Sequence, residues 1–202
     1  MKPYIVAITG ASGVGYGWRL VEALGELKIP VELVVSDAAK IVMREEMGNE
    51  AKLPEASRLL RIHDFHDFTA PIASGSYPTE GMVVIPCSMG TLGAIASGLS
   101  QNLIHRAADC AIKEGRKLIL VPRETPLSAI HLENMLKLSR LGVRIVPAMP
   151  AFYSGRQSIQ DLVDFIAGKA LDQMDIPHAL YPRWVGSLQA TKPQGTRPPC
   201  QD

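Results

Sequence analysis

Residues 4–13, YIVAITGASG, place a short apolar run directly before a glycine-rich turn. The run YIVAIT has β-branched side chains and no polar interruption, which is typical of a strand buried on both faces. Beyond the turn, Leu20, Val21, Leu24 and Leu27 recur at helical spacing. A buried strand, a glycine turn and an amphipathic helix in this order indicate the first unit of a parallel α/β sheet.

The rest of the chain repeats this alternation. Apolar runs at 31–35, 82–86, 117–122 and 143–147 predict further strands. Helices are expected after residue 36, near Leu59, after residue 88, at 127–141 and from residue 158. The predicted fold class is therefore α/β: a three-layer, doubly wound parallel sheet of the Rossmann-like type. Residues 1–185 would form a single domain, and the polar, proline-containing stretch 186–202 a flexible C-terminal tail.

Composition excludes several classes of protein. The chain has 202 residues, 47% of them hydrophobic, which is enough for one domain with a sizeable core. Its 21 basic and 20 acidic residues leave no basic excess for a nucleic acid or a membrane surface. The three cysteines are far apart and form neither a disulfide framework nor a zinc motif. No segment has the ~20 apolar residues of a membrane span, so we expect a cytoplasmic protein.

Polar and small residues follow the expected strands where each one ends. These stretches are Gly10-Ala11-Ser12-Gly13, Ser36, Cys87–Thr91, Arg123-Glu124-Thr125 and Ala151–Ser154. Parallel strands bring their carboxyl ends to one sheet edge, where ligands bind. Glycine, hydroxyl groups, helix N-termini and arginine together favour a flat, phosphate-bearing ligand such as a nucleotide or a flavin. Taken singly, each of these turns could equally be a helix cap. Arg123 alone could be a surface residue that pairs with Glu124.

Standard nucleotide and metal motifs fit poorly. No lysine follows the glycines as a P-loop requires, and glycines at 10, 13, 15 and 17 do not match G-x-G-x-x-G. Asp37 nevertheless lies where a ribose-binding acid would, so a dinucleotide site stays open as an alternative. His63 and His66 could share a metal ion, but the sequence offers no third ligand, and we expect no metal site.

Six motifs occur in order along nearly the whole chain, from Ile5 to about Trp184. They are TGASG (9–13), VSDAA (35–39), ASGSYPTEGMVVIPCSMGTL (73–92), NLIHRAADCAIKEGRKLILVPRETPLSAIHLENMLKLSRLG (102–142), PAMPAFY (147–153) and PRW (182–184). Together they resemble the UbiX-like flavin prenyltransferases, of the phenolic acid decarboxylase type. These belong to the fold family of the homo-oligomeric flavin-containing Cys decarboxylases. The resemblance implies a cytoplasmic, Rossmann-like flavoprotein that assembles as a dodecamer built from trimers.

The same resemblance implies a reaction. A dimethylallyl group would pass without a metal from dimethylallyl phosphate to N5 and C6 of reduced FMN, and the prenylated FMN would serve a UbiD-type decarboxylase. The implied FMN site comprises Gly10, Ala11, Ser12, Ser36, Ser88, Met89, Gly90, Thr91 and Arg123. The implied dimethylallyl phosphate site comprises Lys113, Glu124, Tyr153 and Lys169, supported by Arg106 and Glu46, partly across a subunit interface. No matched position departs from the family pattern.

The chemistry of these residues suits that reaction. Lys113, Lys169 and Tyr153 can stabilise a departing phosphate, and Glu124 can protonate it. Ser12 could position a proton at N5, while Trp184 and Met89 would present polarizable surface to an allyl cation. The expected catalytic residues are Ser12, Glu46, Lys113 and Glu124. Either lysine, taken alone, is also typical of a solvated helix face. Lys113 could simply complement the dipole at the C-terminus of its helix.

Two other functions are compatible with such a fold. Flavin-dependent cysteine decarboxylases carry a P-x-M-N-x-x-M clamp, but here Pro150 replaces the asparagine and Tyr153 the second methionine. A non-catalytic flavin carrier would keep the FMN turns but would have no use for Lys113, Glu124, Tyr153 and Lys169. The sequence therefore favours the transferase, with the carrier as the alternative.

Overall fold

The protein was studied as a computed structural model, which describes residues 1–48, 52–153 and 158–186. Six strands are present in this part of the chain: β1 (Tyr4–Ile8), β2 (Val31–Val35), β3 (Leu60–His63), β4 (Gly81–Cys87), β5 (Lys117–Pro122) and β6 (Arg144–Ile145). The helices are α1 (Val14–Glu26), α2 (Asp37–Met47), α3 (Met89–Ala96), α4 (Leu103–Lys113), α5 (Ala129–Arg140) and α6 (Ile159–Gln173), with a short 3₁₀ turn η1 (Pro71–Ala73).

The strands form one parallel sheet in the order β3-β2-β1-β4-β5-β6. Strand order reverses direction between β1 and β4, which is the switch point where doubly wound sheets bind ligands. The predicted fold class is confirmed. The four central strands are buried along almost their whole length, as their unbroken apolar runs indicated.

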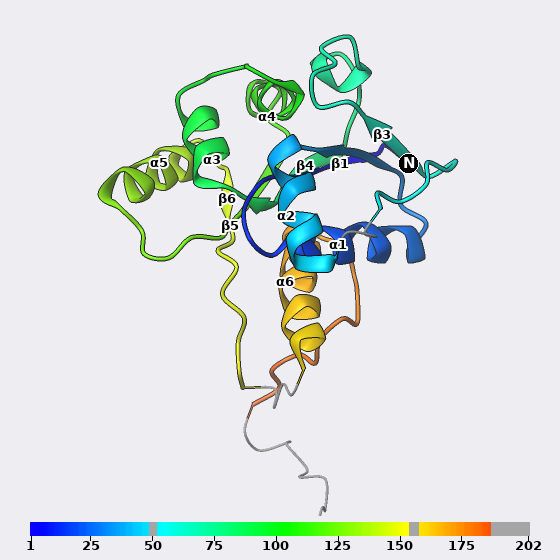
Figure 1. Ribbon diagram of the computed structural model, residues 1–202, viewed down its shortest axis with the longest axis vertical. Helices are drawn as coiled ribbons and strands as arrows, with labels where there is room; N and C mark the ends of the chain where they lie inside the picture. The colour runs from blue at the N-terminus through cyan, green and yellow to red at the C-terminus, as the bar shows by residue number, and fades with distance from the viewer. Residues whose placement is uncertain (49–51, 154–157, 187–202) are drawn as a thin grey trace, which may run out of the picture.

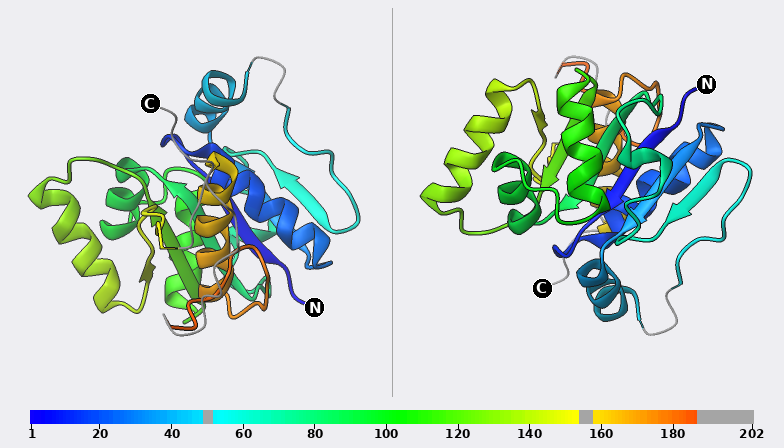
Figure 2. Two further views of the ribbon diagram at one scale, coloured as in Figure 1. Left: turned by 90° about the horizontal axis from the view of Figure 1, so that it is seen from below. Right: turned by 90° about the horizontal axis from the view of Figure 1, so that it is seen from above.

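Two helical layers cover the sheet. Alternate residues of β1 point to opposite faces: Val6 and Ile8 pack with α1, α2 and α6, whereas Ile5 and Ala7 pack with α3 and α4. Figure 1 shows α1 and α6 below the sheet and α4 above it, with α3 and α5 at its left end; the buried residues of α3 and α5 share the α4 face. Figure 2 shows the molecule from below and from above. The sheet therefore separates α4 from α6, a fact that decides how the site is built.

Two sequence expectations differ from the structure. The helix expected near Leu59 is wrong, because residues 60–63 form strand β3: Leu60 and Ile62 pack on the core while Arg61 points to solvent, a period of two. The strand expected at 143–147 is shorter: the N–H groups of Val146 and Ala148 still donate to the carbonyls of Leu120 and Pro122, but Pro122 has no N–H to donate back. Within the described residues no helix is long and apolar enough to cross a membrane. Of the expected tail, only Gly186 is among the described residues.

Candidate FMN and prenyl phosphate site

The turns after β1, β4 and β5 are joined by hydrogen bonds. Thr9, buried at the end of β1, donates from Oγ1 to the carbonyl of Pro86 (2.9 Å) and accepts from the N–H of Ser88 (2.8 Å). The N–H of Arg123 donates to the carbonyl of Cys87 at 3.4 Å. The residues expected at the FMN site from these three turns are therefore held next to one another at the carboxyl edge of the sheet.

The turn after β1 also lies against the start of α2. A Cβ on Gly10 would be 2.4 Å from the Cβ of Ala38, so only glycine allows this approach. Ser36 is buried at the N-cap of α2 and accepts from the N–H of Ala39 at 3.1 Å. The TGASG and VSDAA motifs thus meet in space, with Gly10 against Ala38 and the Ser36 N–H bonded to the carbonyl of Ile8 at the end of β1.

The N-terminus of α3 presents donors for an anion. Ser88 caps this helix, accepting from the Thr91 N–H at 3.2 Å and donating to the Thr91 hydroxyl at 3.0 Å. The first-turn N–H groups of Met89 and Gly90 have no hydrogen-bond partner within the described part of the chain. Apart from the adjoining backbone of α3, no atom of the described residues lies within 4 Å of where a Cβ of Gly90 would be, so a ligand can approach the backbone there. These features fit a flavin phosphate.

The N-terminus of α1 already holds a negative charge. The Glu46 carboxylate, from α2, accepts from the N–H of Gly13 at 2.9 and 3.0 Å and from that of Val14 at 3.0 Å. In dinucleotide-binding folds a pyrophosphate takes this position. Asp37, the expected ribose ligand of that alternative, is instead paired with Lys40 at 3.0 Å and with His66 at 2.8 Å. The geometry therefore disfavours a dinucleotide.

A cleft opens beyond β5, on the side of α5. It has a volume of about 280 Å³, and its walls combine the polar groups of Arg123 and Glu124 with the apolar side chains of Leu127, Leu132, Met135 and Met149. Glu124 Oε1 accepts from the Thr125 N–H at 3.0 Å. A carboxylate in the wall of a largely apolar cleft suits an alkyl substrate that must be kept from water.

Three residues of the expected donor site lie on α6 or beside it. The ring of Tyr153 lies edge-on to Trp184, with 5.3 Å between ring centroids, and 6.5 Å from the ring of Phe165. Lys169, one turn further along α6, is 3.3 Å from the carboxylate of Asp172. Tyr153, Trp184 and Lys169 therefore belong to the α6 side of the sheet.

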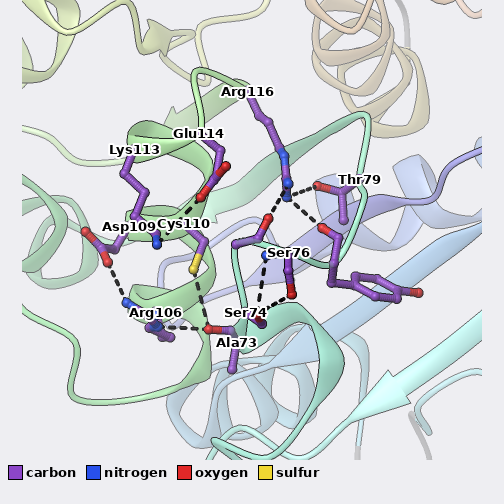
Figure 3. A network of polar contacts seen from close by, with 12 residues as sticks. Ala73, Ser74, Ser76, Thr79, Arg106, Asp109, Cys110, Lys113, Glu114 and Arg116 are labelled. Carbon is purple, nitrogen blue, oxygen red and sulfur yellow. Dashed lines mark hydrogen bonds and ion pairs between the residues drawn. The ribbon is translucent and has the colours of Figure 1, made fainter.

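Lys113 and Arg106 lie elsewhere, on α4. Arg106 donates to the carbonyl of Ala73 (2.9 Å) and to Asp109 (2.8 Å), and Lys113 is 3.6 Å from Glu114, as Figure 3 shows. Lys113 ends the helix that leads into β5, whereas Glu124 follows that strand, whose six residues span about 20 Å. Within one chain Lys113 thus lies about a strand's length from Glu124, and the sheet separates both Lys113 and Arg106 from Lys169.

The metal alternative gains no support from the two histidines. His63 is bonded to the buried Glu32 at 2.5 Å, and His66 to Asp37. Among the described residues no three His, Cys, Asp or Glu side chains come together as metal ligands do. Metal-independence of the reaction remains a prediction.

Known proteins share this chain's sequence and fold. The profile of the Flavoprotein family matches residues 1–171. A flavin prenyltransferase UbiX from Halalkalibacterium halodurans is 51% identical over 190 residues, covering 90% of this chain and 92% of the relative. The UbiX of Aquifex aeolicus is 48% identical over 189 residues, covering 92% and 100%.

This chain belongs to the UbiX family of flavin prenyltransferases.

Solved structures agree with this membership. AnUbiX in complex with FMN and dimethylallyl pyrophosphate superposes with a TM-score of 0.87 at 42% identity, covering 92% of this chain and 98% of that one. A dodecameric FMN-dependent UbiX-like decarboxylase from Escherichia coli gives 0.83 at 46%, covering 91% and 100%. The cysteine decarboxylase TvaF, with a TM-score of 0.59 at 13% identity over 87% and 99% of the chains, shares the fold alone.

Sequence reasoning misses two parts of this UbiX-family site. Thr9 stands in the sequence only as the end of a strand, and nothing local indicates that its hydroxyl joins two turns. Asp172, which joins Lys169 to Arg183, is not among the expected residues, because no motif spacing in the sequence connects these three positions.

Proposed function

We propose that this protein transfers a dimethylallyl group from dimethylallyl phosphate to N5 and C6 of reduced FMN. The prenylated FMN would then serve a UbiD-type decarboxylase. The observation that carries the proposal is the open N-terminus of α3 at the switch point of a UbiX-family chain, joined through the Arg123 N–H and the Cys87 carbonyl to the turn that bears Arg123 and Glu124. We further expect a cytoplasmic enzyme, since Cys87 and Cys110 are both free and buried thiols.

The FMN would bind at the carboxyl edge of the sheet. Its phosphate would be held by the α3 N-terminus, with the Ser88 and Thr91 hydroxyls and the guanidinium of Arg123 as further donors. The turn of Gly10, Ala11 and Ser12, together with Ser36 and Met89, would line the flavin ring. When bound, reduced FMN supplies the nucleophilic N5 and C6 positions that receive the alkyl group.

The donor phosphate would be held by residues of more than one copy of the chain. Lys169 and Tyr153 would come from one copy and Lys113 and Arg106 from another, because the sheet separates the two pairs within a chain. The exposed apolar side chains of α5, Ile130, Leu132 and Leu136, offer a surface for such contacts. A dodecamer, as in the UbiX-like structure from Escherichia coli, would supply them.

The protein's own groups would then lower the barrier to ionisation of the donor. Each well-placed cationic or hydroxyl donor on a leaving phosphate contributes about 3–4 kcal/mol. Glu124 would protonate that phosphate, and the apolar walls of the cleft would exclude water from the allyl cation. Ser12 would hold a proton near N5, and Glu46 would fix the turn that carries Ser12 through the Gly13 N–H.

The deciding experiment is anaerobic incubation of the protein with reduced FMN, dimethylallyl phosphate and a chelator, followed by mass spectrometry of the extracted flavin. We expect one added dimethylallyl unit for the wild type, much less for Glu124→Gln, and a normal yield for Glu55→Gln, an exposed glutamate between α2 and β3. Flavin bound tightly but returned unchanged would overturn the proposal in favour of a carrier. Product that appears only without the chelator would contradict metal-independence.

A further inference from the structure

A single carboxylate near the end of α6 collects four polar side chains. Asp172, whose side chain is 18% exposed, accepts from the hydroxyl of Tyr181 and pairs with Arg183 at 2.7 Å. His178 Nε2 lies 3.1 Å from its Oδ1, and Lys169 Nζ lies 3.3 Å from its Oδ2. Three of these partners belong to the segment that follows α6, and the fourth is the lysine proposed to hold the donor phosphate.

The segment that supplies these partners is packed closely on α6. A Cβ on Gly168 would be 2.6 Å from the ring of Tyr181 and 2.7 Å from that of His178, so the segment needs glycine at this point of the helix. The Tyr181 ring also packs on the Phe165 ring, with centroids 4.8 Å apart. The Arg183 guanidinium lies 4.8 Å from the centroid of the Tyr181 ring. Residues 178–183 therefore follow the surface of α6 in one defined path.

That path carries Trp184 to Tyr153. Arg183, held by Asp172, directly precedes Trp184, whose ring lies against the ring of Tyr153. The positions of Trp184 and of the Tyr153 ring that it contacts thus depend on the path of residues 178–183. The third donor-site group, Lys169, contacts Asp172 itself. Lys169 and Arg183 together outweigh the one carboxylate, so the patch keeps the positive charge that a phosphate needs.

We propose that Asp172 is a positioning residue of the donor site: it fixes the Lys169 ammonium directly, and fixes Trp184 over Tyr153 through Tyr181 and Arg183. The proposal rests on the proposed function, since it concerns the site for dimethylallyl phosphate. Asp172 does not itself contact the reacting atoms. It holds the donor-binding side chains in place before the donor binds, which lowers the entropy cost of ordering them on binding.

The first test is the steady-state kinetics of Asp172→Asn with saturating reduced FMN. We expect the KM for dimethylallyl phosphate to rise about ten-fold, the effect of losing one charge-assisted hydrogen bond that fixes a ligand group. FMN affinity should stay within about two-fold of the wild type, because the FMN turns lie at the carboxyl edge and share no contact with Asp172. Asp164→Asn is the matched control: it lies on the same helix and loses a 2.7 Å pair with Arg19, away from the donor site.

A second readout does not depend on activity. In a Trp18→Phe background, Trp184 is the one remaining tryptophan, and acrylamide quenching of its fluorescence reports its exposure. Quenching should increase in Asp172→Asn and, to a smaller extent, in Tyr181→Phe, but not in Asp164→Asn. A merely structural role would lower stability and FMN binding together without this selective change.

The outcomes separate the two proposals. An active wild type with an unchanged KM in Asp172→Asn overturns the positioning role and leaves the transferase intact. Parallel loss of donor and FMN affinity in both Asp172→Asn and Asp164→Asn also overturns it, because a general loss of folding would then explain the effect. A wild type that forms no prenylated flavin overturns the proposed function and, with it, the role of Asp172 in binding the donor.

Discussion

Glu46 accepts three N–H···O contacts from Gly13 and Val14, although 32 and 33 residues separate it from them. It thereby supplies, from within the protein, the negative charge that a helix N-terminus favours. The N-terminus of α3 therefore stays available for a phosphate, and Gly90 keeps the backbone accessible there. One side chain thus distinguishes this site from a dinucleotide site on the same strand order.

Removing that carboxylate should weaken the start of α1. We expect Glu46→Ala to lower the free energy of unfolding by about 1 kcal/mol, as for the loss of a helix cap. Glu45→Ala, the neighbouring exposed position, should have little effect. Urea denaturation of both variants measures the difference. Equal stability of the two variants would show that the contacts with Gly13 and Val14 contribute nothing.

Asp172 predicts a pH dependence of stability. Although burial opposes ionisation, hydrogen bonds from Tyr181, Arg183, His178 and Lys169 lower the pKa of Asp172 from 3.8 to about 2. The folded state therefore holds fewer protons than the unfolded state between these values. The stabilisation is complete above the unfolded-state pKa and is lost as the pH falls through the folded-state pKa.

The stability advantage of the wild type over Asp172→Asn should therefore be constant near neutral pH and shrink between about pH 4 and about pH 2. Chemical denaturation of both proteins across this range measures it. An advantage that grows on acidification would contradict the assigned cause.

Helix α1 approaches the sheet closely at one glycine. A Cβ on Gly17 would be 2.2 Å from the carbonyl oxygen of Ile85 in β4, and a backbone atom there cannot move aside. At Gly25, in the same helix, no described atom outside the helix's own backbone lies within 4 Å of where a Cβ would be. The two positions differ in packing rather than in helix propensity.

We therefore expect Gly17→Ala to destabilise the protein by about 1–3 kcal/mol through overpacking. Gly25→Ala should be neutral or should stabilise it by up to about 1 kcal/mol, since alanine favours helix. Thermal denaturation of the two variants compares them directly. A Gly17→Ala variant as stable as Gly25→Ala would show that α1 can shift away from β4 without cost.

The elements themselves follow closely from local sequence patterns. The unbroken apolar runs of β1, β2, β4 and β5 identify buried parallel strands, and Ser36, Ser88 and Ser158 mark helix starts through their side-chain caps. The edge strand β3 is mistaken for a helix because it has only four residues, too few to distinguish a period of two from a helical turn.

The separation of Lys113 from Glu124 is a property of the whole molecule. Lys113 ends the helix before β5 and Glu124 follows that strand, so the proposed site would draw these two groups from neighbouring copies. Lys113→Ala and Glu124→Gln should each leave little activity alone. Co-expressed and co-purified, they should recover about a quarter of wild-type activity, because each half of a shared site is intact in half of the copies.

The measurement is the yield of prenylated flavin from the mixed oligomer, with separately purified and briefly mixed variants as the control. Absence of recovery in the co-expressed sample would show that each site uses groups of a single chain. Recovery would support the assignment of Lys113 to a copy other than the one that supplies Glu124.

The sequence by itself determined the α/β class, the parallel sheet and the gathering of the FMN turns at one edge. These follow from local apolar runs and from the rule that parallel strands end together. Only the tertiary structure decided which helices share a face, that Glu46 caps α1, and that Asp172 joins Lys169 to the segment bearing Trp184. Such contacts join residues far apart in the chain or scattered without a period. They depend on how helices pack on the sheet, which no local pattern records.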